Sequence, residues 1–231
     1  MSHLSLRLAL CSLFVLFGAD LVGSVDSSKT AKRTPEEITL LVSTDRGVSG
    51  GVYLGFHGEC KALVALHAVE NVRESKLKRG FQTATGTLEW PQKPTKQQKI
   101  DDLAVLNLSW KIGDCMQFEE LVEDPDVFYR NVAEAFGYLN ENAVGKIQRH
   151  FVAERRHRAG IRYWYFPELF NRGSSGSPLL VDGRMIGVVW GNLTDDDQGA
   201  STRYGAAMTN STIRERLRDY LNQRIALNST R

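Results

Sequence analysis

The feature that most constrains the fold of this 231-residue chain is a succession of short apolar segments with the composition of β-strands. The segments are rich in Val, Leu, Thr and aromatic residues, and glycines or clustered charges separate them, as is typical of strands. We expect a first series of strands at Ile38–Thr44, Gly51–Phe56, Cys60–Leu66, Phe81–Trp90 and Leu103–Leu108. A second series is expected at Val127–Leu139, Val144–Val152, Ile161–Phe166, Pro178–Val181, Met185–Trp190 and Tyr204–Met208.

Helical patterns are confined to the two flanks of these strands. Thr34 followed by Pro, Glu and Glu37 predicts an N-cap and one helical turn. Ser211–Arg224 repeats apolar residues at helical spacing and predicts a terminal helix. Between Val181 and Arg184 the dipeptide Asp-Gly predicts a hairpin turn. Two groups of short strands and one terminal helix predict two small antiparallel barrels or sandwiches.

The first 24 residues have the pattern of a secretory signal peptide. A positive segment, Met1–Arg7, precedes the ten-residue apolar run Leu8–Phe17, and small residues follow. A spanning helix needs about 20 apolar residues, so this run is too short to be one. We therefore expect cleavage and a secreted, extracellular protein without membrane association.

We expect five segments along the chain. They are the signal peptide (1–24), a linker or short pro-segment (25–37), an N-terminal barrel (38–122), a C-terminal barrel (123–209), and the C-terminal helix with its tail (210–231). The dipeptide Lys32-Arg33 in the linker is either a processing site or a solvated pair. The acidic stretch Glu119–Asp126 is the expected crossover between the barrels.

Charge and cysteine content exclude several classes of protein. The 29 Lys and Arg against 27 Asp and Glu leave a formal charge of +2, too little for a protein that neutralises nucleic-acid phosphates. Three cysteines are too few for a disulfide-built scaffold. Cys11 leaves with the signal peptide, and Cys60 and Cys115 either form one disulfide or remain buried thiols. Glycosylation sequons, which agree with secretion, begin at Asn107, Asn192, Asn210 and Asn228.

The sequence Gly173-Ser-Ser-Gly-Ser-Pro-Leu179 is suited to a tight turn that presents the Ser175 hydroxyl. The N–H groups of Gly173 and Ser175 are candidates for binding an oxyanion, although the same sequence also fits a plain Gly/Ser loop. A serine needs a neighbouring base to become nucleophilic. His67 is expected to end a buried apolar strand and is the best-placed histidine. Asp102 opens the next strand and is the candidate that orients the imidazole, with Asp101 as its competitor, because successive side chains of a strand point to opposite faces.

Chain order separates the known arrangements of such a triad. No histidine follows Ser175, which excludes the order found in α/β-hydrolases, and position 177 is Ser, so the Gly-x-Ser-x-Gly elbow is absent. The subtilisin order is available with Asp45, but it would need helices that alternate with strands. The remaining order is His67, Asp102, Ser175.

These residues resemble the trypsin/chymotrypsin-like serine peptidases, in particular the compact, disulfide-poor branch with the HtrA-like peptidase domains. The resemblance spans about Ile38 to Leu221. It rests on Ser49-Gly-Gly-Val-Tyr-Leu54, Ala65-Leu-His67-Ala68, Asp102-Leu-Ala-Val-Leu106, Gly173-Ser-Ser-Gly-Ser-Pro178 and Val189-Trp190-Gly191. Three positions depart from the family pattern: Leu66 and Ser177 replace small residues, and Ser174 stands where the pancreatic branch has Asp, so activation by insertion of a freed N-terminus is not expected.

The resemblance implies an all-β fold with two six-stranded antiparallel Greek-key barrels. It further implies a serine endopeptidase with the triad His67, Asp102 and Ser175 and an oxyanion hole formed by Gly173 and Ser175. The P1 pocket would have its floor at Leu169 and Phe170 and its walls at Val189, Trp190, Gly191, Gly205 and Ala206. None of these is acidic, which predicts an apolar P1 side chain.

The same resemblance implies a monomer without cofactor or metal. The expected partners are a polypeptide substrate and protein inhibitors, and neither nucleic acid nor membrane. Two other interpretations remain open. One is a secreted homologue that has lost catalysis and binds partners, and the other is an unrelated β-rich glycoprotein in which the Gly/Ser loop is structural.

Overall fold

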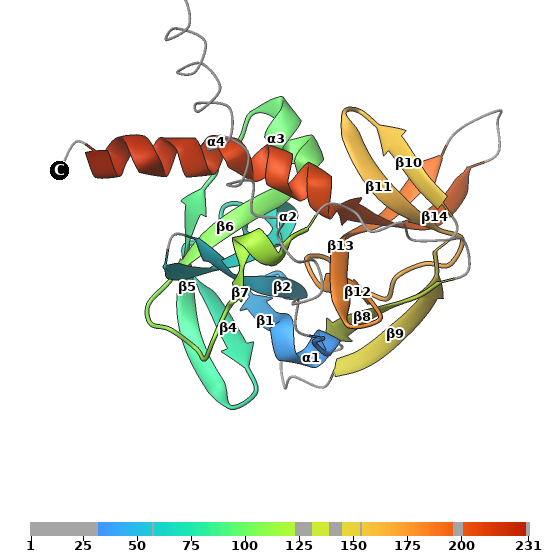
Figure 1. The fold of residues 1–231 in the computed structure, drawn as a ribbon, viewed down its shortest axis with the longest axis horizontal. Helices are drawn as coiled ribbons and strands as arrows, with labels where there is room; N and C mark the ends of the chain where they lie inside the picture. Colours follow the sequence, from blue (N-terminus) through green and yellow to red (C-terminus); the bar gives the residue numbers. More distant parts are fainter. Residues whose placement is uncertain are drawn as a thin grey trace, which may run out of the picture. The chain divides into compact units, whose positions relative to one another are not determined.

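Residues 32–56, 58–122, 131–138, 145–152, 154–195 and 201–229 are described by the computed structural model (Figure 1). The signal peptide and the start of the linker lie outside these residues, as do residues 127–130, Leu139 and Val144 of the expected strands. Among the described helices, none combines the length and the apolar character that a membrane span requires.

The first sheet contains seven strands, six of which close into a barrel. Their order is β1-β4-β5-β6-β3-β2, and β1 also pairs with β2, which completes the ring. β7 is added beside β2 by a short parallel pairing. The strands are β1 (Thr39–Thr44), β2 (Gly47–Phe56), β3 (Glu59–Ala65), β4 (Ser75–Arg79), β5 (Gln82–Trp90), β6 (Leu103–Leu108) and β7 (Met116–Gln117).

The second sheet is antiparallel and forms a half-barrel. Its order is β10-β11-β14-β13-β12-β8-β9, so it holds seven strands where six were expected. The strands are β8 (Val132–Tyr138), β9 (Gly145–Phe151), β10 (Glu154–Arg158), β11 (Ile161–Phe166), β12 (Pro178–Val181), β13 (Arg184–Asp195) and β14 (Thr202–Thr209). The predicted hairpin is confirmed, with Asp182 and Gly183 at φ +51° and +75° in the turn between β12 and β13.

Short helices occupy the connections of the first sheet. They are α1 (Pro35–Ile38), α2 (Leu66–Val69), α3 (Lys96–Asp101) and the 3₁₀ turn η2 (Phe118–Glu120). The predicted N-terminal turn is confirmed: the Thr34 N–H donates to the Glu37 carboxylate over 2.7 Å. The other three helices replace parts of the chain for which the sequence indicated strand or loop.

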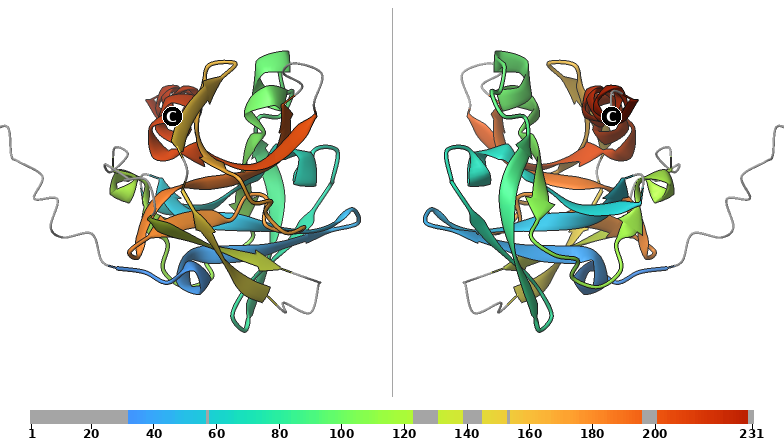
Figure 2. Two further views of the ribbon diagram at one scale, coloured as in Figure 1. Left: turned by 90° about the vertical axis from the view of Figure 1, so that its right-hand side faces the viewer. Right: turned by 90° about the vertical axis from the view of Figure 1, so that its left-hand side faces the viewer.

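The C-terminal helix α4 (Asn210–Ser229) continues from β14 and reaches the first sheet (Figure 1, Figure 2). Its Tyr220 ring packs against Phe56 and Trp90, with centroid distances of 5.6 and 6.1 Å. Leu217 of the helix belongs to the same buried cluster as Leu54 of β2 and Val188 of β13. One core therefore joins the helix to both sheets, and it fixes the sheets against each other along the seam where the candidate catalytic residues lie.

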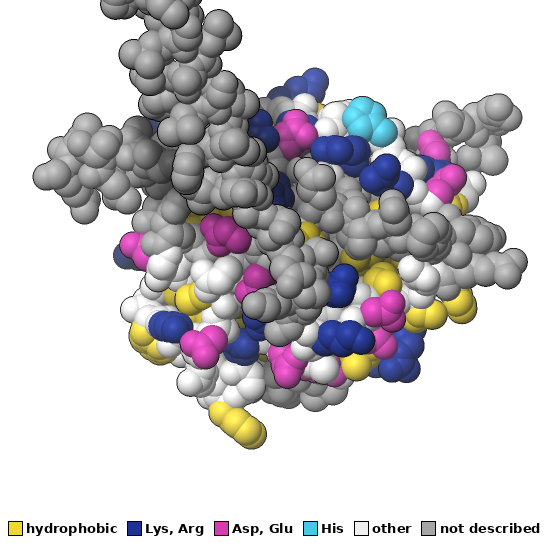
Figure 3. All heavy atoms as spheres, viewed as in Figure 1, with side chains coloured by type: hydrophobic (Ala, Val, Ile, Leu, Met, Phe, Trp, Pro, Cys, Tyr) yellow, Lys and Arg dark blue, Asp and Glu magenta, His cyan; other side chains and the backbone are white. Residues whose placement is uncertain are grey.

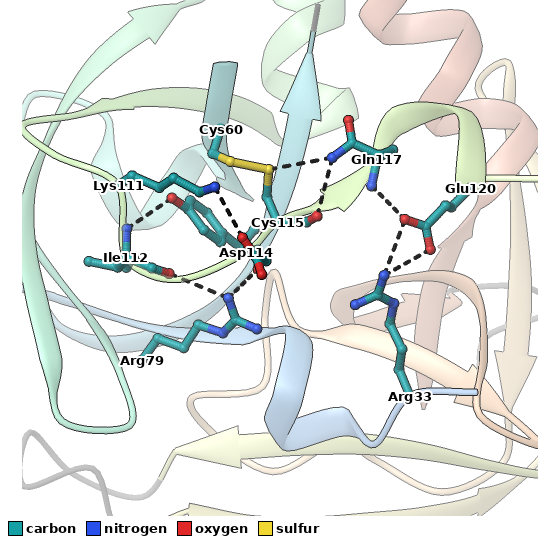
Figure 4. The surroundings of a disulfide bond; sticks show 10 residues. Arg33, Cys60, Arg79, Lys111, Ile112, Asp114, Cys115, Gln117 and Glu120 are labelled. Atoms are coloured by element: carbon teal, nitrogen blue, oxygen red, sulfur yellow. Dashed lines mark hydrogen bonds and ion pairs between the residues drawn. A yellow bond between two sulfur atoms is a disulfide. The ribbon is translucent and has the colours of Figure 1, made fainter. Parts of the chain in front are cut away.

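A disulfide joins Cys60 of β3 to Cys115, just before β7 (Figure 4). It closes a chain separation of 55 residues. In the same region the Arg33 guanidinium lies against both carboxylate oxygens of Glu120, at 3.2 and 3.1 Å. The second residue of the Lys32-Arg33 pair is thus half-buried in an ion pair in the folded chain.

Candidate active site

His67 and Asp102 form a two-point contact. His67 Nδ1 lies 2.6 Å from Asp102 Oδ2, and the His67 backbone N–H donates to Asp102 Oδ1 over 2.7 Å. The hydrogen bond to the carboxylate raises the pKa of His67 above its usual value of 6.5, and burial opposes this rise in part. With Nδ1 donating to Asp102, Nε2 is left as the acceptor, which is the tautomer that a general base requires.

The local structure around this pair differs from the sequence-based expectation. His67 is the second residue of the short helix α2 and does not end a strand. Its neighbour Leu66 is buried in the core of the first barrel, and the Leu66 N–H donates to the Asp102 carbonyl over 3.0 Å. The bulkier residue before His67 therefore anchors α2 beside Asp102.

The side chains of Asp101 and Asp102 have different partners because α3 ends between the two residues, and not because they alternate along a strand. Asp101 is the last residue of α3, and Asp102 is its cap in the left-handed conformation at φ +53°. The Asp101 carboxylate accepts from Gln97 Nε2 over 2.8 Å and lies 3.3 Å from Arg216 Nε of α4. Burial raises its pKa. Asp101 is thus used to attach α3 to α4, and Asp102 alone contacts His67.

The loop of residues 167–177 between β11 and β12 carries the candidate nucleophile Ser175 and is called the nucleophile loop; it is held by close backbone contacts at its glycines. The Gly50 N–H donates to the Ser175 carbonyl over 2.9 Å, and the Gly176 N–H donates to the Val189 carbonyl over 2.8 Å. Gly173 and Gly176 have φ of +87° and +81°. A Cβ at Gly173 would lie 2.0 Å from the Tyr138 carbonyl oxygen, so this turn excludes any side chain.

Ser177, which departs from the family pattern, fits because position 50 is glycine. Its buried hydroxyl donates to the Phe136 carbonyl over 2.7 Å. A Cβ at Gly50 would lie 1.9 Å from Ser177 Oγ. Ser177 therefore fits in the loop only because position 50 of β2 has no side chain.

Gln148 of β9 supports the same loop, a role that the sequence analysis did not predict. The side chain is 6% exposed; its Oε1 accepts the Asn171 N–H over 2.8 Å and its Nε2 donates to Ser174 Oγ over 2.5 Å. A Cβ at Gly137 would lie 2.2 Å from Gln148 Nε2, so this glycine makes room for the amide. Ser174, which has no charge for an ion pair, is instead held by a neutral amide.

A cleft of about 260 Å³ brings the candidate residues together. His67, Ser175 and Gly173 all line it. In the part of the chain that the structure describes, no hydrogen bond joins the Ser175 hydroxyl to the His67 ring; such catalytic contacts are often long before substrate binds. The described residues that line it are Thr44, Arg46, Gly47, Val48, Ser49, His67, Ala68, Phe170, Asn171, Arg172, Gly173, Ser175, Gly191 and Asn192.

The expected P1 pocket is largely filled by the protein itself. A Cβ at Gly205 would lie 3.0 Å from Phe170 Cδ2, so the Phe170 ring covers this glycine. The ring packs against Phe166 and against the buried His150, with centroid distances of 5.1 and 4.7 Å. Phe170 and Gly191 line the cleft, but the other expected pocket residues are not among its lining: Leu169 is exposed, Val189, Gly205 and Ala206 are buried, and Trp190 is half-buried.

The sequons have unequal access to a glycan. Asn107 is exposed on β6, and its Oδ1 accepts from Lys61. Asn192 uses its amide on the Phe170 backbone, accepting over 2.8 Å and donating over 2.8 Å. The prediction of glycosylation at Asn210 is wrong for the folded chain. Asn210 is fully buried and its Nδ2 donates to the Met185 carbonyl, so it has no room for a sugar. The side chain of Asn228 lies outside the described residues.

Comparison with known proteins was informative only at the level of structure. No protein-family model matches the sequence, and no curated protein sequence matches it. Solved structures of serine proteases do match. Rv3671c from M. tuberculosis H37Rv, a mutant in the inactive form, superposes with a TM-score of 0.59 at 13% identity, over 79% of this chain and 86% of that one.

The chain has the chymotrypsin-like serine protease fold. The protease domain of MamO from Magnetospirillum magneticum matches with a TM-score of 0.58 at 15% identity, over 80% of this chain and 98% of that domain. The HtrA-type protease AlgW, solved with a tripeptide, matches with a TM-score of 0.57 at 18% identity, over 78% of this chain and 58% of that one. The expected resemblance to HtrA-type and trypsin-like domains is confirmed at the level of fold.

Proposed function

We propose that the protein is a secreted serine endopeptidase that hydrolyses peptide bonds through an acyl-enzyme. The observation that carries the proposal is the His67–Asp102 contact, in which one carboxylate binds both the ring Nδ1 and the backbone N–H of the same histidine. This fixes the position and the tautomer of the imidazole at a cleft that Ser175 also lines.

Each group then has one role in acyl transfer. Ser175 Oγ attacks the scissile carbonyl carbon while His67 Nε2 takes the hydroxyl proton and returns it to the leaving amine. Asp102 stabilises the imidazolium that forms. The N–H groups of Gly173 and Ser175 stabilise the oxyanion. Water then hydrolyses the ester by the same steps, with His67 again acting as the base.

We further propose an apolar P1 preference in a shallow subsite. The Phe170 ring lies over Gly205, and this arrangement leaves no depth for a long side chain. A buried charge without a partner would carry a desolvation cost, which disfavours Lys and Arg at P1. In a peptide library, cleavage is expected after small apolar residues; preferential cleavage after Lys or Arg would contradict this part of the proposal.

The test of the proposal is covalent labelling by diisopropyl fluorophosphate, followed by peptide mapping. We expect a single label on Ser175, no label in Ser175→Ala, and a loss of turnover of at least about 10⁴-fold in that variant. The matched control is the exposed Ser201→Ala, which should label and turn over like the parent protein. An unlabelled parent protein would reject catalysis and favour a homologue that only binds partners.

A further inference from the structure

The charged side chains that line the cleft are basic. Of the residues that line it, Arg46 and Arg172 are the charged ones beside His67, and its described lining includes no carboxylate. Asp45 precedes Arg46 in the turn between β1 and β2 but is not part of the lining. The chain as a whole has a formal charge of only +2, and on the face shown in Figure 3 basic and acidic side chains are interspersed. The cleft therefore has an excess of positive charge that the rest of the chain does not.

Both guanidinium groups are free to bind a ligand. Arg46 and Arg172 are exposed, and within the described ranges neither guanidinium has a hydrogen bond or an ion pair. Other arginines of the chain do have carboxylate partners, among them Arg33 with Glu120, Arg149 with Glu134 and Arg216 with Asp101. Arg184 also has no partner among the described residues, so the cleft is distinguished by the two such arginines that line it together.

The backbone holds both arginines close to the nucleophile loop. The Arg46 N–H donates to Thr44 Oγ1 over 3.2 Å in a tight turn that Gly47 completes at φ +125°. Two residues further, Val48 Cγ2 would lie 3.6 Å from a Cβ at Gly173, and Arg172 directly precedes that glycine. Both side chains therefore approach the cleft from its Gly173 end. Phe170 and Asn192, which bond to each other, occupy the P1 end beside Gly191.

We propose that the cleft selects polypeptide segments that carry carboxylate side chains next to the P1 residue, with Arg46 and Arg172 as the residues that determine this specificity. The inference rests on the proposed function and names its class of substrate. Arginine presents a planar set of donors that matches a carboxylate, and such charge-assisted pairs add geometric specificity. A complementary potential also accelerates encounter, so the preference should weaken at high ionic strength.

The first experiment measures kcat/KM for fluorogenic peptides of identical length with Ala at P1. One set has Asp at the positions that flank P1, and the other has the near-isosteric Asn there. We expect the Asp peptides to be cleaved about tenfold faster at low ionic strength, and this ratio to approach one in Arg46→Gln/Arg172→Gln. The matched control is Arg184→Gln, an exposed arginine of the β12–β13 hairpin outside the cleft, which should retain the ratio of the parent protein.

The second experiment separates the failure of this inference from the failure of catalysis. The same peptides, labelled with fluorescein, are bound to the Ser175→Ala variant and followed by fluorescence anisotropy, which requires no turnover. Tighter binding of Asp peptides that is lost with the two arginines supports the inference even if the parent protein is not labelled by diisopropyl fluorophosphate. Equal binding and equal cleavage of Asp and Asn peptides overturns it, whether or not Ser175 is labelled.

Discussion

The buried amide of Gln148 gives the sharpest test of how the nucleophile loop is held. Gln148→Leu keeps the size of the side chain and removes both hydrogen bonds, to the Asn171 N–H and to Ser174 Oγ. Ser174 is fully buried, so its hydroxyl would lose its partner without access to water. A buried polar group without a partner costs about 1–3 kcal/mol, and we expect a loss of about 2 kcal/mol in the free energy of unfolding.

For a chain of this size a loss of about 2 kcal/mol corresponds to a decrease of about 4–8 °C in Tm, which differential scanning calorimetry resolves. Because the two bonds hold the residues that precede Gly173 and Ser175, the rate of labelling by diisopropyl fluorophosphate should fall about tenfold or more, and KM for peptides should change little. The exposed Gln82→Leu is the matched control and should change neither quantity.

A double variant distinguishes a positioning role from general destabilisation. Gln148→Leu/Ser174→Ala removes both members of the pair, so its Tm should recover toward that of the parent, because no buried hydroxyl is left without a partner. The labelling rate should stay low, because Asn171 still lacks its acceptor. A single variant with the Tm and the labelling rate of the parent protein would refute this account of the loop.

Four further predictions concern His67, the disulfide and Gly50. Turnover should rise with pH through a midpoint above 6.5, because His67 must be neutral to act as the base and the Asp102 hydrogen bond raises its pKa. In Asp102→Asn the midpoint of the pH–rate profile should move to lower pH, and kcat should fall about 10⁴-fold. Because protonated His67 is favoured in the folded state, its raised pKa stabilises the fold below pH 6.5. The free energy of unfolding, measured in urea, should lose this contribution as pH rises through the pKa of His67, and Asp102→Asn should not show this loss. The double variant Cys60→Ser/Cys115→Ser should lose about 2–4 kcal/mol in the free energy of unfolding in urea, because the disulfide closes a separation of 55 residues. A reductant should lower the stability of the parent protein to the same level and leave that of the variant unchanged. Gly50→Ala should lose about 1–3 kcal/mol, because its Cβ would overlap Ser177 Oγ and would also lie 2.9 Å from Ser177 Cα. Adding Ser177→Gly should restore part of the loss in Tm, because the contact with the Cα remains; no recovery at all would show that the Ser177 side chain is not a cause.

The sequence was sufficient to predict the fold because the hydrophobic pattern determines it. Apolar strand segments such as Ala62–Ala65 of β3 are buried, and their composition alone indicated strand. β4 was missed although its pattern alternates, because only Leu77 of Ser-Lys-Leu-Lys-Arg is apolar. β10 was missed for a similar reason: its sequence, Glu-Arg-Arg-His-Arg, has no apolar residue, yet it pairs with β11 along its full length.

The candidate site was predicted less completely, because several of its contacts are long-range. The sequence indicated the pair of His67 and Asp102 through the strands that precede and follow these residues, but it gave no sign of the helices that hold them. Gln148 lies 26 residues before Ser174, in a strand whose other polar residues, Lys146, Arg149 and His150, give no reason to single it out, and the pairing of β9 with β8 brings the two residues together. The filling of the P1 pocket by Phe170 likewise depends on its packing against β9 and β11.

The ion pair between Asp101 and Arg216 makes the last helix a support for Asp102, the carboxylate proposed to orient His67. Asp102 follows directly after the residue that Arg216 holds, and Tyr220 anchors the same helix on the first barrel. Loss of the chain beyond residue 215 would leave every proposed catalytic residue in place in the sequence, yet it would release the end of α3 and expose a buried carboxylate. The C-terminal helix, through Arg216 and Asp101, thus helps to position Asp102 and with it the His67 ring.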